Sequence, residues 1–83
     1  MIIRIHPHAR RRMIERGATP DQVRLTVSSG RATPAKFGRT QFRLTFSHNA
    51  AWLGKWYAQK QIDAFAAKIP GGWLVVTVVV KYF

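Results

Sequence analysis

The chain has 83 residues, 47% of them apolar, and no cysteine. A chain of this length supports one hydrophobic core, so we expect a single domain over residues 1–83, held without disulfides or a thiolate zinc site. Its 14 Lys and Arg face three acids, and the net charge of +11 is typical of proteins that bind polyanions such as nucleic acids. An acidic protein partner, or a role in solubility alone, would also explain this charge.

No stretch of the sequence has the length and composition of a signal peptide or a membrane span. Met1–His6 is soon interrupted by charge, and the apolar run Trp73–Val80 is far shorter than the roughly 20 residues that cross a bilayer. The basic residues are not gathered on one long amphipathic helix of the kind that lies on membranes. We therefore expect a cytoplasmic protein that does not bind membranes.

The opening residues favour a short strand followed by a helix. The isoleucines of Ile2–Ile5 suit a strand, and Pro7 suits the first turn of a helix. This helix is expected to end before Gly17, which adopts the left-handed conformation readily. Ala9 and Met13 should face the core, with the neighbouring isoleucine a further candidate.

A second helix is predicted from Pro20 to Ser28. Thr19 and Gln22 have the spacing of a capping box, in which each side chain binds a backbone N–H of the other residue. Val23 and Val27 lie one turn apart and form the apolar stripe. We expect this stripe to pack against a sheet.

The middle of the chain is predicted to contain a loop, a strand and a turn. Residues 31–38 lack a regular pattern and are expected to form the loop. Arg39–Phe46 alternates polar and apolar residues, as in a strand with one buried face. Residues 47–54 are rich in turn-forming residues and are expected to form the turn.

The last third is predicted to be a β-hairpin. Lys55–Ile69 fits either a helix or a strand, and we favour a strand because residues 70–72 suit a tight turn into the apolar strand Trp73–Tyr82. The predicted fold is therefore α+β, with two amino-terminal helices packed on a three- to four-stranded antiparallel sheet. All three tryptophans are expected to belong to the core: Trp52, Trp56 and Trp73.

The three histidines, His6, His8 and His48, suggest a metal site, but the composition argues against one. Without cysteine and with three acids, a complete ligand set is hard to assemble. Two-metal nuclease chemistry needs several clustered acids as well. We therefore expect no metal and no other cofactor.

Cleavage of RNA without a metal is compatible with the residues present. It needs a group that takes the proton of the 2′-hydroxyl, cations that stabilise the phosphate, and a group that protonates the leaving oxygen. His8 is the candidate general base or acid, and Arg12, one helical turn later, is the candidate phosphate clamp. Tyr57 is a third candidate, because a tyrosine can handle a proton or stack on a base. The alternative is that His8 caps the helix and Tyr57 packs as an ordinary aromatic residue.

Further cations are candidates for contacts with phosphate. Each of them alone would most often be a solvated surface charge, so they count as candidates because of the overall charge. They are Arg10, Arg16, Arg39, Arg43, Lys55 and Lys60.

The segment His8–Thr19 contains the pattern H-A-x-x-R-M-x-x-R-G. This pattern resembles the opening of a family of small bacterial domains of unknown function, which is similar to toxins of the RelE and BrnT type. The resemblance covers the first third of the chain and, loosely, the strand around Val76–Val78. It implies a RelE-like fold, shared with barnase-like and colicin-type ribonucleases, in which helices precede an antiparallel sheet that cuts RNA. His8, Arg12 and Arg16 match the polar positions of the pattern.

Charge, candidate residues and resemblance together predict a metal-independent ribonuclease or a ribosome-associated toxin. Its substrate would be RNA, and its partner an acidic antitoxin able to neutralise the +11 charge. Two alternatives stay open. One is a nucleic-acid-binding module without catalysis, and the other is a protein-interaction domain whose positive surface binds an acidic chain.

Overall fold

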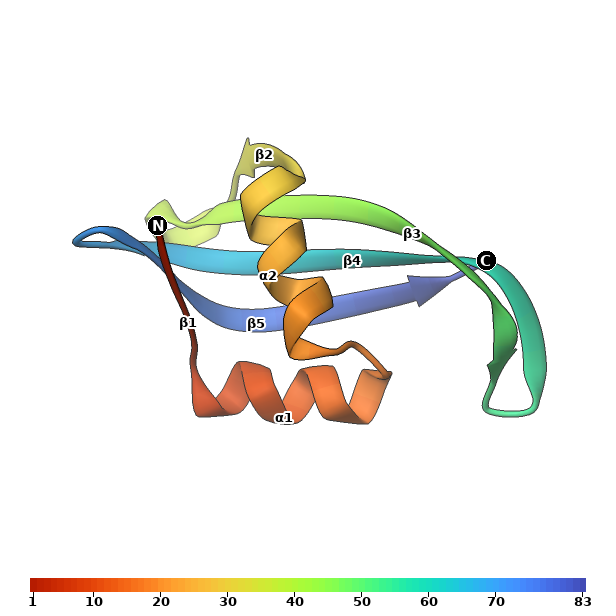
Figure 1. Ribbon diagram of the computed structural model, residues 1–83. Coiled ribbons are helices and arrows are strands. Elements are labelled where there is room, and N and C mark those ends of the chain that lie inside the picture. Colours follow the sequence, from red (N-terminus) through yellow and green to blue (C-terminus); the bar gives the residue numbers. More distant parts are fainter.

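A five-stranded sheet carries both helices on one face and leaves the other face without a helix (Figure 1). The computed structural model describes all residues, 1–83. The elements in chain order are β1 (Ile2–Ile5), α1 (Pro7–Arg16), α2 (Pro20–Ser29), β2 (Arg31–Pro34), a 3₁₀ turn η1 (Lys36–Gly38), β3 (Thr40–Trp52), β4 (Lys55–Ile69) and β5 (Gly72–Tyr82). Neither helix has the length and hydrophobicity needed to cross a membrane.

The sheet has the strand order β1-β5-β4-β3-β2 and is mixed. β1 runs parallel to the first part of β5, and all other neighbours are antiparallel. The α+β class with two helices is confirmed, whereas the predicted three- to four-stranded antiparallel sheet is wrong in strand number and in the direction of one pair. The missing strand is β2, which we predicted as part of a loop. All four of its residues are exposed, so it has no hydrophobic pattern and is held by backbone pairing to β3.

The hairpin between β3 and β4 is longer than predicted. The expected turn over residues 47–54 is wrong, because β3 continues to Trp52 with a bulge between Ser47 and Ala50. The turn consists of Leu53 and Gly54, which both have positive φ angles, 49° and 82°, as in a type I′ turn. The prediction of a strand for Lys55–Ile69 is confirmed.

The core lies between the helices and the sheet. It consists of Ala9, Met13, Ala18, Val23, Val27, Phe42, Ile62, Ala64, Ala66, Val75 and Val78, which includes every core residue expected of the two helices except Ile14. Ile14 is 69% exposed, because it follows Met13 and points about 100° away from it around the helix. Trp56 is 60% exposed, so its expected place in the core is wrong as well. It alternates with Tyr57 on β4 and points away from the face on which Tyr57 packs.

The carboxyl end of α1 is tied to the sheet by side chains that donate to its last carbonyl oxygens. The Tyr82 hydroxyl donates to the Arg16 oxygen at 2.7 Å, and the Lys60 ammonium donates to the Gly17 oxygen at 2.8 Å. Trp52 stacks on Tyr82 with ring centres 5.2 Å apart. Burial lowers the pKa of Lys60 and raises the pKa of Tyr82. Gly17 is left-handed, with φ 80°, and a Cβ there would overlap both aromatic side chains.

Replacing Tyr82 with phenylalanine is expected to reduce the sensitivity of the fold to alkali. A group whose pKa is raised by folding stabilises the folded state fully below its unfolded pKa, here 10.0, and this stabilisation is lost as the pH rises through the folded pKa. Between about pH 9 and about pH 11, the urea midpoint of the wild type should therefore fall further than that of Tyr82→Phe. Equal falls in the two midpoints would contradict the expectation.

Candidate nucleic-acid interface

A β-bulge in β5 shapes the open face of the sheet, which is the face opposite the helices. Thr77 pairs with Phe65, and Val75 pairs with the β4 residue that follows Phe65, so Val76 is an extra residue in β5. Val75 and Val78 are both buried in the core, three positions apart instead of two. Because strand residues otherwise alternate between faces, Val76 and Thr77 both lie on the open face.

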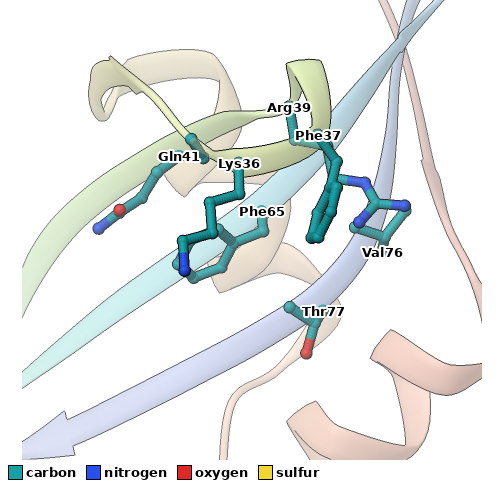
Figure 2. Close-up of a pocket in the computed structure, with 8 residues that line it drawn as sticks. Lys36, Phe37, Arg39, Gln41, Phe65, Val76 and Thr77 are labelled. Carbon is teal, nitrogen blue, oxygen red and sulfur yellow. The ribbon is translucent and has the colours of Figure 1, made fainter.

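A first hollow on the open face lies beneath the loop that joins β2 to β3, and we call it the loop hollow. Its volume is about 390 Å³, and it is lined by Ala35, Lys36, Phe37, Arg39, Gln41, Phe65, Val76 and Thr77. Figure 2 shows Lys36 and Phe37 reaching from the loop toward the sheet, where Phe65 comes from β4 and Thr77 from β5. Two aromatic rings, two cations and two neutral polar groups thus surround one space.

The loop is closed by a backbone hydrogen bond from the Ala35 N–H to the Arg39 oxygen at 2.9 Å. Its tip contains two consecutive left-handed residues, Phe37 with φ 61° and Gly38 with φ 69°. The Arg39 guanidinium lies 5.8 Å from the centre of the Phe37 ring, within the range of a cation–π contact. These contacts define the position of the Phe37 side chain even though it is 85% exposed.

A second hollow adjoins the first, and we call it the histidine hollow. Its volume is about 450 Å³, and it is lined by His6, His8, Arg39, Val76 and Thr77. The His6 Nδ1 accepts a hydrogen bond from the His8 backbone N–H at 3.1 Å and thereby caps the start of α1. In the neutral imidazole, the hydrogen of His6 is then on Nε2. Because Arg39, Val76 and Thr77 line both hollows, the two hollows are adjacent on the open face.

The charge of the open face is positive. Arg31 and Arg43 line a further small hollow on it, beside the side chain of Gln41. Arg43 binds both carboxylate oxygens of Asp63, at 2.7 and 3.2 Å, and this hydrogen bonding raises the pKa of its guanidinium. The other two acids of the chain are on the helices. The Asp63 side chain, which is 11% exposed, is therefore neutralised by Arg43. Arg39 forms no ion pair and can bind an anion.

The predicted catalytic trio does not converge. His8 lines the histidine hollow, but Arg12 is paired with Glu15 at 3.2 Å on the surface of α1. Tyr57 packs near Tyr82, with ring centres 5.5 Å apart. The Tyr82 hydroxyl is hydrogen-bonded to the carboxyl end of α1, the end opposite to His8. Eight helical residues separate His8 from that end, a distance of roughly 12 Å. The structure instead brings His8 together with Arg39, one of the cations predicted to contact phosphate.

The remaining predicted cations have different roles. Arg16 donates to the Val78 oxygen at 2.5 Å, on the part of β5 that β1 does not cover. Lys60 is 5% exposed, and its ammonium is bound to a backbone oxygen, so it does not belong to the open face. Arg10 is exposed on α1, and Lys55 lies 5.6 Å from the centre of the Tyr57 ring. Neither lines one of the two hollows.

Several residues of the two hollows were missed from the sequence. His6 was considered as a metal ligand and set aside, although its position before Pro7 is that of a helix cap. Phe37 belongs to a stretch predicted as an irregular loop. Phe65 and Thr77 face the hollows because of the strand register and the bulge at Val76, and neither feature has a signal in the local composition.

The structure contains no group of three or more His, Cys, Asp or Glu side chains that could hold a metal ion. No protein-family model, no curated protein and no solved structure matches the chain. The resemblance of His8–Thr19 to the opening of a toxin-like family therefore remains a prediction. What the site can do is inferred from its own geometry and charge.

Two substitutions of His6 test whether its side chain stabilises α1 as a helix cap. His6→Ala removes the acceptor for the His8 N–H and is expected to lower the free energy of unfolding by about 1 kcal/mol. His6→Asn keeps a capping acceptor, so its stability should stay close to that of the wild type. Urea unfolding followed by circular dichroism measures both variants. If His6→Ala were as stable as His6→Asn, the observed hydrogen bond would not stabilise α1.

Proposed function

We propose that the protein is a basic RNA-interacting domain that binds RNA on the open face of its sheet. The observation that carries the proposal is the pair of adjacent hollows: Arg39, which forms no ion pair, lines both of them, and His6 and His8 line one. Cations that stabilise phosphate and imidazoles that move protons are the groups that RNA chemistry uses when no metal is present. The net charge of +11 supports a polyanionic ligand.

The reaction that these groups support is metal-independent cleavage of RNA. The 2′-hydroxyl attacks the adjacent phosphorus, and its proton passes to one imidazole as the new P–O bond forms. The bond from phosphorus to the 5′-oxygen breaks, and a second imidazole, in its protonated form, gives its proton to that oxygen. The products are a 2′,3′-cyclic phosphate and a free 5′-hydroxyl. His8 would take the proton of the 2′-hydroxyl, and Arg39 would stabilise the charge on the phosphate. His6 would give the second proton once it is protonated and its Nδ1 has released the His8 N–H.

The biological setting proposed for this activity is a RelE-like toxin of a toxin–antitoxin pair, acting on free RNA or at the ribosome in the cytoplasm. The resemblance of His8–Thr19 to the RelE and BrnT type supports it, and the two helices that precede four of the five strands are compatible with it. An acidic antitoxin that covers the open face would both neutralise the charge and block the hollows.

A nucleic-acid-binding module without catalysis is the second candidate. The hydrogen bond from the His8 N–H to His6 favours it, because capping alone explains why an imidazole occupies position 6. The ion pair of Arg12 with Glu15 favours it as well, since it removes a cation expected to serve in catalysis. In this case the open face binds phosphate and releases RNA unchanged.

Replacing Arg39 with glutamine is expected to weaken binding of a single-stranded oligoribonucleotide by roughly tenfold, the loss of one charge-assisted hydrogen bond. The slope of log affinity against log salt should also fall in magnitude by about 0.7, the value for one phosphate contact on a single strand. Arg24→Gln on the exposed surface of α2 removes the same charge from the helix side and is the matched control. Fluorescence anisotropy over a salt series measures both. Equal weakening by the two variants would mean that net charge alone drives binding.

His8→Ala tests the proposed chemistry. We expect the wild type to cleave single-stranded RNA in the presence of EDTA and to leave cyclic phosphate ends, and we expect His8→Ala to reduce the cleavage rate by a factor of about 100 or more while binding stays near normal. His6→Asn should lower the rate too, although its fold is intact. Product ends are identified by mass spectrometry. Binding without cleavage by the wild type would favour the second candidate function.

A further inference from the structure

We propose that the loop hollow is a binding site for one unpaired base, so that the RNA bound by this protein is single-stranded at that position. The inference rests on the proposed function and deepens it, because it names the class of substrate that the open face accepts. The loop hollow is lined by two aromatic side chains, Phe37 and Phe65, and by polar groups around them.

Phe37 does not contribute to the core. Its side chain is 85% exposed, and its backbone has φ 61° and ψ 34°, a conformation that bulky residues rarely adopt. The conformation is maintained by the hydrogen bond between Ala35 and Arg39 that closes the loop. The tight turn at the tip of the loop explains the left-handed backbone, as it does at Leu53, but such a turn does not require an aromatic side chain. Strained positions cluster at functional sites, including those that bind ligands.

The surroundings of the rings suit a nucleobase. Phe37 approaches the hollow from the loop and Phe65 from β4, so a base in the hollow would have an aromatic side chain from each of these two elements within its surroundings (Figure 2). The Gln41 amide and the Thr77 hydroxyl line the same space and offer donors and acceptors to the edge of a base. Stacking on aromatic side chains combined with hydrogen bonds to exposed base edges is the usual manner in which proteins read single-stranded RNA.

The position of Arg39 connects this base to the proposed chemistry. Arg39 lines both hollows, so a nucleotide whose base occupies the loop hollow would place its phosphate beside Arg39 in the histidine hollow. A base inside a duplex is stacked between its neighbours and paired, and it cannot enter the loop hollow without being extruded. Duplex RNA should therefore bind through its backbone alone, and more weakly.

The experiment compares three ligands that carry 2′-O-methyl groups, which prevents cleavage during the measurement. They are a single-stranded hexamer, the duplex of the same sequence, and an abasic strand with the same number of phosphates. The wild type should bind the single strand roughly tenfold more tightly than the abasic strand, a difference typical of one or two stacked bases. Phe37→Leu should lose most of this difference and should bind the abasic strand as the wild type does.

Two controls keep the result interpretable. Trp56→Leu removes another exposed aromatic side chain, on the β3–β4 hairpin and outside both hollows, and should leave binding of all three ligands unchanged. Phe37→Gly relieves the strain of the left-handed backbone, so its midpoint temperature of thermal unfolding should be at least that of the wild type. Its affinity for the single strand should nevertheless be weaker.

The possible outcomes separate the inference from the proposed function. Equal affinity of the wild type for the single strand and the abasic strand would overturn the base site, while binding of RNA to the open face would stand. The same holds if Phe37→Leu binds the single strand as tightly as the wild type. If the wild type bound none of the three ligands, the proposed function would fail together with the inference.

Discussion

The extra residue in β5 is the constraint on which the arrangement of the open face depends. β5 must bury Val75 and Val78 against the helices, and it must also pair with β4 along most of its length. The bulge at Val76 satisfies both demands and changes which side chains point to the other face. Val76 and Thr77 become neighbours there and form the common floor of the two hollows. Without the bulge, the residues beyond it would exchange faces, and the core and the open face would change together.

The structure divides the cations of the chain into two groups, those with partners inside the fold and those without. Some cations act within the fold: Arg16 and Lys60 donate to backbone oxygens at the edge of β5 and at the end of α1, and Arg43 neutralises Asp63. Arg16 and Lys60 replace hydrogen bonds that water would otherwise supply to the backbone. Arg39 has no such partner and lies where the hollows meet. Net charge alone therefore overstates the surface that is available to a polyanion, and position decides which cations can bind one.

How far the sequence predicts this molecule depends on how local each signal is. Both helices, the capping box of Thr19 and Gln22 and the last hairpin follow from patterns within a dozen residues, whereas the His6 cap of α1 was missed. β2 escaped prediction because pairing with β3, and not burial, holds it. The site was predicted only in part because it, too, depends on contacts between residues that are far apart in the sequence. His8 and Arg39 were each candidates, but their meeting depends on a strand register and a bulge that distant residues determine.

The loop above the open face shows how stability and function are divided in this small domain. The core requires nothing of Phe37, and a left-handed phenylalanine costs on the order of 1–3 kcal/mol relative to a relaxed backbone. A domain of this size has little stability to lose, since its whole free energy of unfolding is expected to be about 5–15 kcal/mol. Glycine at position 37 would avoid the strain but would leave the loop hollow without one of its two rings. The aromatic side chain therefore has a cost in folding, and the base proposed to bind in the loop hollow would supply the reason for it.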